Sequence, residues 1–97
     1  MRPKTIIKED VLRHAIDLAR SLGYTNVTRE MLAQRAGISP AQVSVLFGTM
    51  PQLRRAIMSA AVARKDLGVI AQGIVAGEPK AKACAVELKL AAVARLV

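Results

Sequence analysis

The chain has 97 residues, of which 53 % are hydrophobic, and its formal net charge at pH 7 is +8. A chain of this length forms one small domain, or one domain with an added oligomerisation element. Its one cysteine and one histidine exclude an internal disulfide and a zinc site built on cysteine ligands. The excess of Lys and Arg indicates a polyanionic partner, most commonly nucleic acid, unless the charge serves only to keep the protein soluble.

The apolar residues are mainly Ala, Val, Leu and Ile, which favours an all-α fold of closely packed helices. No nucleophile–base pair, P-loop or glycine-rich dinucleotide turn occurs, so we expect no enzymatic activity, no cofactor and no metal site. Lys and Arg interrupt every longer apolar stretch, and the N-terminal residues lack the apolar run of a signal peptide. We therefore expect a cytoplasmic protein that does not contact a membrane.

In chain order, residues 1–5 form a short basic arm, and the first predicted helix runs from residue 7 or 8 to Leu22. Gly23 ends this helix, because glycine adopts the left-handed conformation at no steric cost. Tyr24 follows as an aromatic plug, and we expect Val27 to pack beneath the next helix. The predicted buried stripe of the first helix consists of Val11, Leu12, Ala15, Ile16, Leu18 and Ala19.

Two short helices separated by a glycine turn are predicted next. Thr28 is the expected N-cap of the first, in which Met31, Leu32 and Ala36 recur at helical spacing. Gly37 closes that helix, and the following Ile38 supplies the apolar contact that often accompanies such a stop.

A second start signal follows at once. Ser39 and Gln42 have the spacing of a capping box, and Pro40 occupies the first helical position, so a helix is predicted over residues 40–47. Thr49 and Gln52 repeat the signal at the start of a fourth helix. Three helix starts in close succession, with a glycine turn between the first two helices, are typical of a helix-turn-helix.

The stretch from Val11 to Ile57 resembles the N-terminal DNA-binding domain of tetracycline-repressor (TetR) type regulators, and it aligns with the family pattern without a gap. The resemblance implies a three-helix helix-turn-helix domain with a fourth helix, followed by a helical region that dimerises. The features that carry it are Ala15 and Leu18 before Gly23-Tyr24, Thr28 at the second helix, Leu32-Ala33 and Ala36-Gly37-Ile38-Ser39 at the turn, and Phe47-Gly48-Thr49 leading to Leu53.

The sequence departs from the family pattern in its recognition helix. Family members usually have Leu-Tyr-x-Tyr/His-Phe where this chain has Val43-Ser44-Val45-Leu46-Phe47, and they commonly have lysine where Met50 stands. Two expected phosphate contacts are therefore missing. Either other cations replace them or the partner is not ordinary duplex DNA; the candidates for the first explanation are Arg2, Lys4, Lys8, Arg54 and Arg55.

The C-terminal part is short for this family. We expect the fourth helix to run from Met50 to residue 66 or 67, and residues 68–79 to be either a frayed continuation of it or a linker. A last helix is predicted over residues 80–96, with an apolar face that needs a partner. The predicted division is a DNA-binding domain over residues 1–67 and a dimerisation tail over residues 68–97, with Val86, Leu90, Val93 and Val97 in a homodimer interface.

These features predict a sequence-specific protein that binds double-stranded DNA, as a small homodimeric repressor that places helix 40–47 in the major groove of a pseudo-palindromic operator. Gln42 is either a reader of adenine or only a member of the capping box. The alternatives are a DNA-organising or partition protein and a helix-turn-helix reused for protein interaction. The predicted DNA-contacting residues are Lys4, Lys8, Thr28, Arg29, Ser39, Pro40, Ala41, Gln42, Ser44, Val45, Thr49 and Arg54.

The chain after residue 67 also bears on small-molecule binding. Its helices must already bury their own apolar faces, and a ligand pocket of ~300 to 1,000 Å³ needs more walls than they provide. We therefore expect no small-molecule effector.

Overall fold

The regular elements of this protein are all helical in the computed structural model, which describes residues 4–95 and the side chains from residue 8 onward. The all-α prediction is therefore confirmed for that part of the chain. The elements are α1 (Lys4–Leu22), the 3₁₀ turn η1 (Tyr24–Asn26), α2 (Arg29–Ala36), α3 (Pro40–Phe47), α4 (Met50–Ala63), α5 (Leu67–Ala76), α6 (Pro79–Lys82) and α7 (Val86–Ala94).

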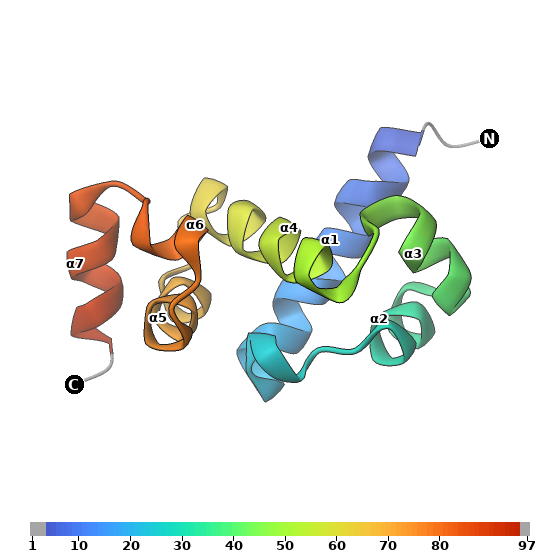
Figure 1. Cartoon of the computed structure of the whole chain (residues 1–97), viewed down its shortest axis with the longest axis horizontal. Helices are drawn as coiled ribbons and strands as arrows, with labels where there is room; N and C mark the ends of the chain where they lie inside the picture. The colour runs from blue at the N-terminus through green and yellow to red at the C-terminus, as the bar shows by residue number, and fades with distance from the viewer. Residues whose placement is uncertain (1–3, 96–97) are drawn as a thin grey trace.

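The helices occupy two ends of an elongated molecule, with α4 running between them (Figure 1). The principal extents are 41 × 23 × 19 Å. α2 and α3 lie at one end together with the N-terminal part of α1, and α5, α6 and α7 lie at the other. α4 packs against helices of both groups, so it fixes how the two ends are oriented relative to each other.

The predicted buried stripe of α1 faces the core. Val11, Ala15, Ile16 and Ala19 are buried, and the two leucines of the stripe are half-buried against the same cluster. α1 begins at Lys4, which is earlier than predicted. It ends before Gly23, whose φ of 91° lies in the region that favours glycine.

The region after α4 differs from the prediction. α4 ends at Ala63, and the chain turns through Arg64 and Lys65, the latter at φ 55°. Asp66 then caps a new helix by accepting a hydrogen bond from the backbone N–H of Val69. Asp66 is thus a local N-cap at a helix start that was not predicted from the sequence.

Residues 67–76 form a helix with one buried face, so the predicted frayed extension or linker is wrong for this stretch. Val69, Ile70, Ala71 and Gly73 of α5 are buried, and α5 packs against α1, α4, α6 and α7. Gly73 permits the close packing, because a Cβ at this position would lie 2.5 Å from Met58 Cε of α4 and 2.7 Å from Ala81 Cβ of α6.

The single helix predicted over residues 80–96 is also wrong, because α6 ends at Lys82 and α7 begins at Val86. No glycine or proline marks the break. Tertiary packing accounts for it: Ala81 is buried in the α4–α5–α6 contact, whereas Ala92 is buried where α7 packs on α5. Tertiary packing of this kind routinely overrides helix propensity.

Among the described residues, none of the helices combines the length and the apolar content that crossing a bilayer requires.

Candidate nucleic-acid interface

α2 and α3 pack against each other at one corner of the molecule and are joined by a three-residue turn. Leu32 and Ala33 of α2 and Val43 and Phe47 of α3 are buried in the shared core. Gly37 has φ 74°, in the left-handed region, and the backbone N–H of Ile38 donates to the carbonyl oxygen of Ala33 at 3.0 Å. The turn therefore closes as the sequence predicted.

Three predicted N-caps are confirmed around this corner. Thr28 Oγ1 accepts from the backbone N–H of Met31 at 3.2 Å, and Ser39 and Thr49 each open a complete capping box. The Thr49 hydroxyl also donates to Gln52 Oε1 at 3.2 Å. The hydroxyl protons of Thr28 and Ser39, by contrast, form no hydrogen bond among the described residues, so both groups can still donate to an outside acceptor.

The solvent face of α3 is apolar or neutral. Pro40, Ala41 and Gln42 are exposed, Val45 is 73 % exposed, and Ser44 is half-buried. No charged residue occurs between residues 40 and 47. Contacts made by this face therefore depend on shape, methyl groups and neutral hydrogen bonds.

Gln42 takes part in the capping box. Its Oε1 accepts from the backbone N–H of Ser39 at 2.8 Å, and its own backbone N–H donates to Ser39 Oγ at 3.2 Å. Bidentate recognition of adenine needs both the amide oxygen and the amide nitrogen. Because the oxygen already bonds Ser39, the amide nitrogen is the part of Gln42 that is free to bind a partner.

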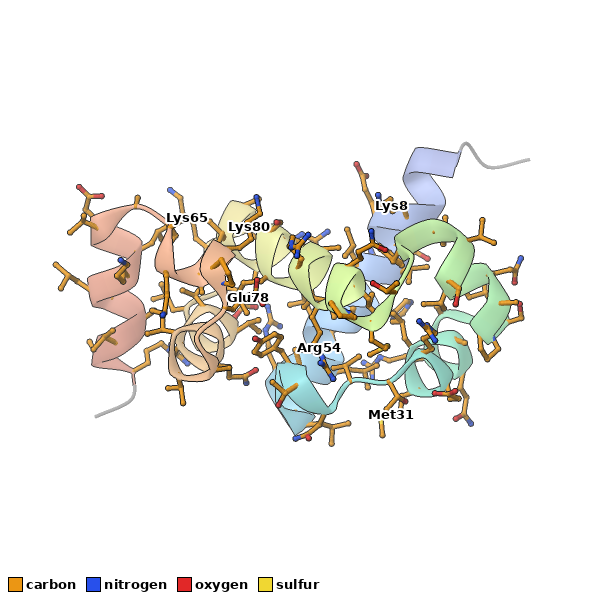
Figure 2. All side chains as sticks on the ribbon, in the orientation of Figure 1. Lys8, Met31, Arg54, Lys65, Glu78 and Lys80 are labelled. Carbon is orange, nitrogen blue, oxygen red and sulfur yellow. The ribbon has the colours of Figure 1, made fainter. Side chains whose placement is uncertain are left out.

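Two arginines, one on α2 and one on α4, have a buried guanidinium Nε without a hydrogen-bond partner among the described residues. Arg29, in the first turn of α2, is half-buried, and its Nε is buried without a hydrogen-bond partner among the described residues. Arg54 of α4 donates from one terminal nitrogen to the carbonyl oxygen of Thr25 at 3.4 Å, while its Nε is likewise unpartnered. Figure 2 shows Arg54 reaching from α4 toward η1. Each guanidinium has five donors, so both can still bind an oxyanion.

Lys8 connects α1 with the end of α3. Its Nζ lies 5.6 Å from the centroid of the Phe47 ring, within the range of a cation–π contact. The lysine is exposed and lies beside α3, where it could reach a phosphate of DNA bound to that helix. The side chain of Lys4, predicted to act with it, lies outside the described side chains, although its backbone starts α1.

Several other arginines are engaged in ion pairs. Arg13 pairs with Asp10, Arg35 lies 3.7 Å from Asp17, and Arg20 approaches Asp66 at 2.6 Å. By contrast, Lys8, Arg29, Arg54 and Arg55 form no ion pair with another described residue. The unpaired cations around the α2–α3 corner are thus available to an external anion.

Met31 of α2 is 41 % exposed and points away from the body of the molecule (Figure 2). Met31 belongs to the apolar repeat that predicted α2, but it does not lie on the buried face that Leu32 and Ala33 form. Met31 therefore adds an apolar side chain to the surface of α2.

The predicted dimerisation residues lie on a second surface, at the other end of the molecule. Val86 is 67 %, Leu90 66 % and Val93 40 % exposed, and all three lie along one side of α7. Val97 falls outside the described residues. Ala92 on the opposite side is buried against α5, so the exposed residues point away from the rest of the subunit.

An open cleft of about 430 Å³ lies where the end of α1, the α4–α5 turn and the end of α7 meet. Ligand pockets of comparable volume are usually enclosed and mostly apolar, whereas this cleft is open and its lining includes Arg20, Lys65, Asp66 and Arg95. The expectation of no small-molecule effector stays a prediction. Within the part of the chain described, no three His, Cys, Asp or Glu side chains come together to hold a metal ion.

The chain was compared with protein-family models, curated proteins and solved structures, and no match was found in any of the three comparisons. The resemblance to TetR-type domains therefore stays a prediction from the sequence.

Proposed function

We propose that this protein binds double-stranded DNA in a sequence-specific manner and acts as a small homodimeric transcriptional repressor. In this proposal α2 and α3 are the two helices of a helix-turn-helix, as in TetR-type regulators, and α3 enters the major groove. The observation that carries it is the pairing of a neutral, exposed α3 face with unpaired arginines on both neighbouring helices. In such a complex the neutral side chains of α3 contact base edges, while the arginines beside it bind phosphates.

The phosphate contacts come from residues around the corner and not from α3 itself. Arg29 lies in the first turn of α2, where a cation gains nothing from the helix dipole. A bound phosphate would stabilise the charge at this position. Arg54 of α4 reaches the carbonyl oxygen of Thr25 in η1, before the start of α2, and Lys8 of α1 lies over the Phe47 ring at the end of α3. These three residues replace the tyrosines and the lysine that the family pattern would supply.

A second copy of the protein gives the complex a second DNA-binding corner. One helix-turn-helix reads few base pairs, and repressors of this class gain affinity by engaging two sites at once. The exposed Val86, Leu90 and Val93 provide the surface through which a second copy binds.

The proposal is tested by fluorescence anisotropy with short labelled duplexes, taken from the DNA upstream of the protein's own gene and from a random-sequence selection. We expect binding to one duplex to exceed binding to a scrambled duplex by at least ~10³-fold. Affinity should fall by roughly 10³ to 10⁵ between 50 and 200 mM salt if a dimer contacts ~6 to 10 phosphates. Equal affinity for every duplex would instead support a DNA-organising protein.

A second candidate is a module that binds another protein through α7. The exposed apolar face of α7 and the exposed Met31 and Val45 favour it. This candidate predicts that no duplex is bound in the anisotropy assay at low salt, and binding with the expected salt dependence would exclude it.

A further inference from the structure

The two functional surfaces lie at opposite ends of the molecule. Figure 1 shows α3 and α7 at the two ends of the longest axis, which is 41 Å. α3 packs inward on α2 and α4, and α7 packs inward on α5, so the exposed face of each helix points away from the other. This arrangement constrains what a pair of subunits can do with DNA.

The exposed face of α7 has the features of a self-complementary helix seam. Val86, Leu90 and Val93 follow the alternating four- and three-residue spacing of coiled-coil core positions. Glu87 and Lys89 flank this stripe on opposite edges, as the 100° turn per residue requires. When two α7 helices pair in parallel around a twofold axis, each Glu87 faces the edge on which the second copy carries Lys89.

We propose that two copies associate through α7 and hold two separate DNA segments together, one at each end of the dimer. The pairing places the α3 helices at opposite ends of a particle about twice 41 Å long, facing away from each other. Adjacent half-sites on one straight duplex lie ~34 Å apart on the same side of the DNA. The α7-linked dimer does not match that geometry, so it closes a loop between two sites or bridges two molecules. This inference rests on the proposed DNA binding and extends it.

Bridging is measured with a duplex immobilised on beads and a second, fluorescent duplex in solution, both carrying the sequence found by selection. The parent protein should retain the fluorescent duplex on the beads, and excess unlabelled duplex should release it. Leu90→Asp should raise the dimer dissociation constant on the order of 100-fold, because it places a charge in an apolar interface. The Leu90→Asp protein should therefore retain no fluorescent duplex on the beads. Anisotropy should show that it still binds a single duplex in solution.

Two further variants separate loss of the interface from loss of the fold. Leu22→Asp is the matched control: Leu22 is an exposed leucine of α1, outside the α7 stripe, and its substitution should leave bridging intact. Glu87→Lys and Lys89→Glu should each weaken the dimer. The double charge swap should restore both dimerisation, measured by analytical sedimentation, and bridging.

Each outcome decides a specific point. If the Leu90→Asp protein stays dimeric and still bridges, α7 is not the interface and the inference is wrong. If the parent dimer binds one duplex with two adjacent half-sites and retains no second duplex, the dimer does not bridge. If the parent binds no duplex, the proposed function fails together with bridging, whereas sedimentation of the charge-swap variants still decides whether α7 joins the copies.

Discussion

Gln72 of α5 accepts a hydrogen bond from the backbone N–H of Tyr24 at 2.8 Å, and this contact joins the C-terminal helices to the end of α1. The same side chain donates from Nε2 to the carbonyl oxygen of Ala19 at 3.0 Å. One amide thus satisfies two backbone groups at the point where α1 stops. The C-terminal helices are tied by this bridge to the half that carries the proposed DNA-binding corner.

Replacing Gln72 by leucine should destabilise the whole chain. It leaves the part-buried N–H of Tyr24 without its acceptor, at a cost of about 1–3 kcal/mol for an unsatisfied group, while the carbonyl oxygen of Ala19 keeps the hydrogen bond from the N–H of Gly23. Gln72→Glu is the control, since it keeps an acceptor for Tyr24 and loses the donor to Ala19. The free energy of unfolding, measured in urea, should decrease in the order parent, Gln72→Glu, Gln72→Leu. Equal stability of the three proteins would show that the bridge contributes nothing.

Gly73→Ala should destabilise the packing of α5 on α4. The added Cβ would lie 2.5 Å from Met58 Cε and 2.7 Å from Ala81 Cβ, so neighbours must shift, and overpacking of this kind costs typically about 1–3 kcal/mol. Gly68→Ala on the same helix is the control, because its nearest neighbour would be Asp66 Oδ1 at 3.7 Å. Thermal unfolding should show a lower Tm for the first variant and an unchanged or higher Tm for the second.

Stability should fall in alkaline solution because of Tyr24. Burial raises the pKa of its hydroxyl above 10.0, and the charge of the nearby Glu78 raises this pKa further, while Arg54 lowers it. A raised folded pKa means that the unfolded chain releases this proton first, so the contribution is complete below pH 10 and is lost as the pH rises through the folded value. Tyr24 is the only tyrosine, so tyrosinate absorbance follows it directly.

The matching variant is Tyr24→Phe, which removes the titrating group. Its denaturant midpoint should fall less steeply above pH 10 than that of the parent. If both proteins lose stability in parallel, the lysines and not Tyr24 determine alkaline unfolding.

Val45 should read thymine methyl groups in the proposed complex. It is 73 % exposed, and Ala41, also exposed, lies one turn before it on the same side of α3. Replacing a contacted thymine by deoxyuridine removes one methyl group, worth about 0.8 kcal/mol or roughly fourfold in affinity. A Val45→Ala protein should be less sensitive to this replacement. Uracil placed outside the recognised site serves as the control, and equal sensitivity of the two proteins would contradict the assignment.

Arg29→Ala should weaken binding to every duplex by a similar factor, because a phosphate contact carries no sequence information. The slope of log affinity against log salt should decrease by about 0.9 for each lost contact. Arg13→Ala removes the same charge from α1, but this arginine already pairs with Asp10, so a smaller effect is expected. Similar losses in the two variants would show that net charge, and not a specific contact, sets the affinity.

Helix ends defined by neighbouring residues could be predicted from the sequence, whereas those set by distant contacts could not. Thr28, Gly37 and Ser39 act through hydrogen bonds that span a few residues, and their roles are confirmed. The helical α5 and the break before α7 depend on burial of Gly73 and Ala92 against other helices, and no local pattern reports this. The N-cap at Asp66 is a local feature of the sequence, but the glycines that follow it favoured the prediction of a linker over that of a helix.

The candidate site shows the same division. The exposed positions of α3 follow from its helical period, so Ala41 and Val45 could be named in advance. The contact of Lys8 with Phe47 and the reach of Arg54 to Thr25 join residues far apart in the chain, and their geometry required the fold. Whether these residues bind DNA stays a prediction.

The capping box at Ser39 also has an evolutionary consequence. Glutamate serves as well as glutamine at the third helical position, and an acidic residue there is favoured by the helix dipole. A Gln42→Glu chain should therefore fold at least as stably as the parent while it presents a negative charge to phosphate oxygens. Because one nucleotide change converts a glutamine codon to a glutamate codon, a single step at this position would remove the proposed DNA recognition without loss of the fold.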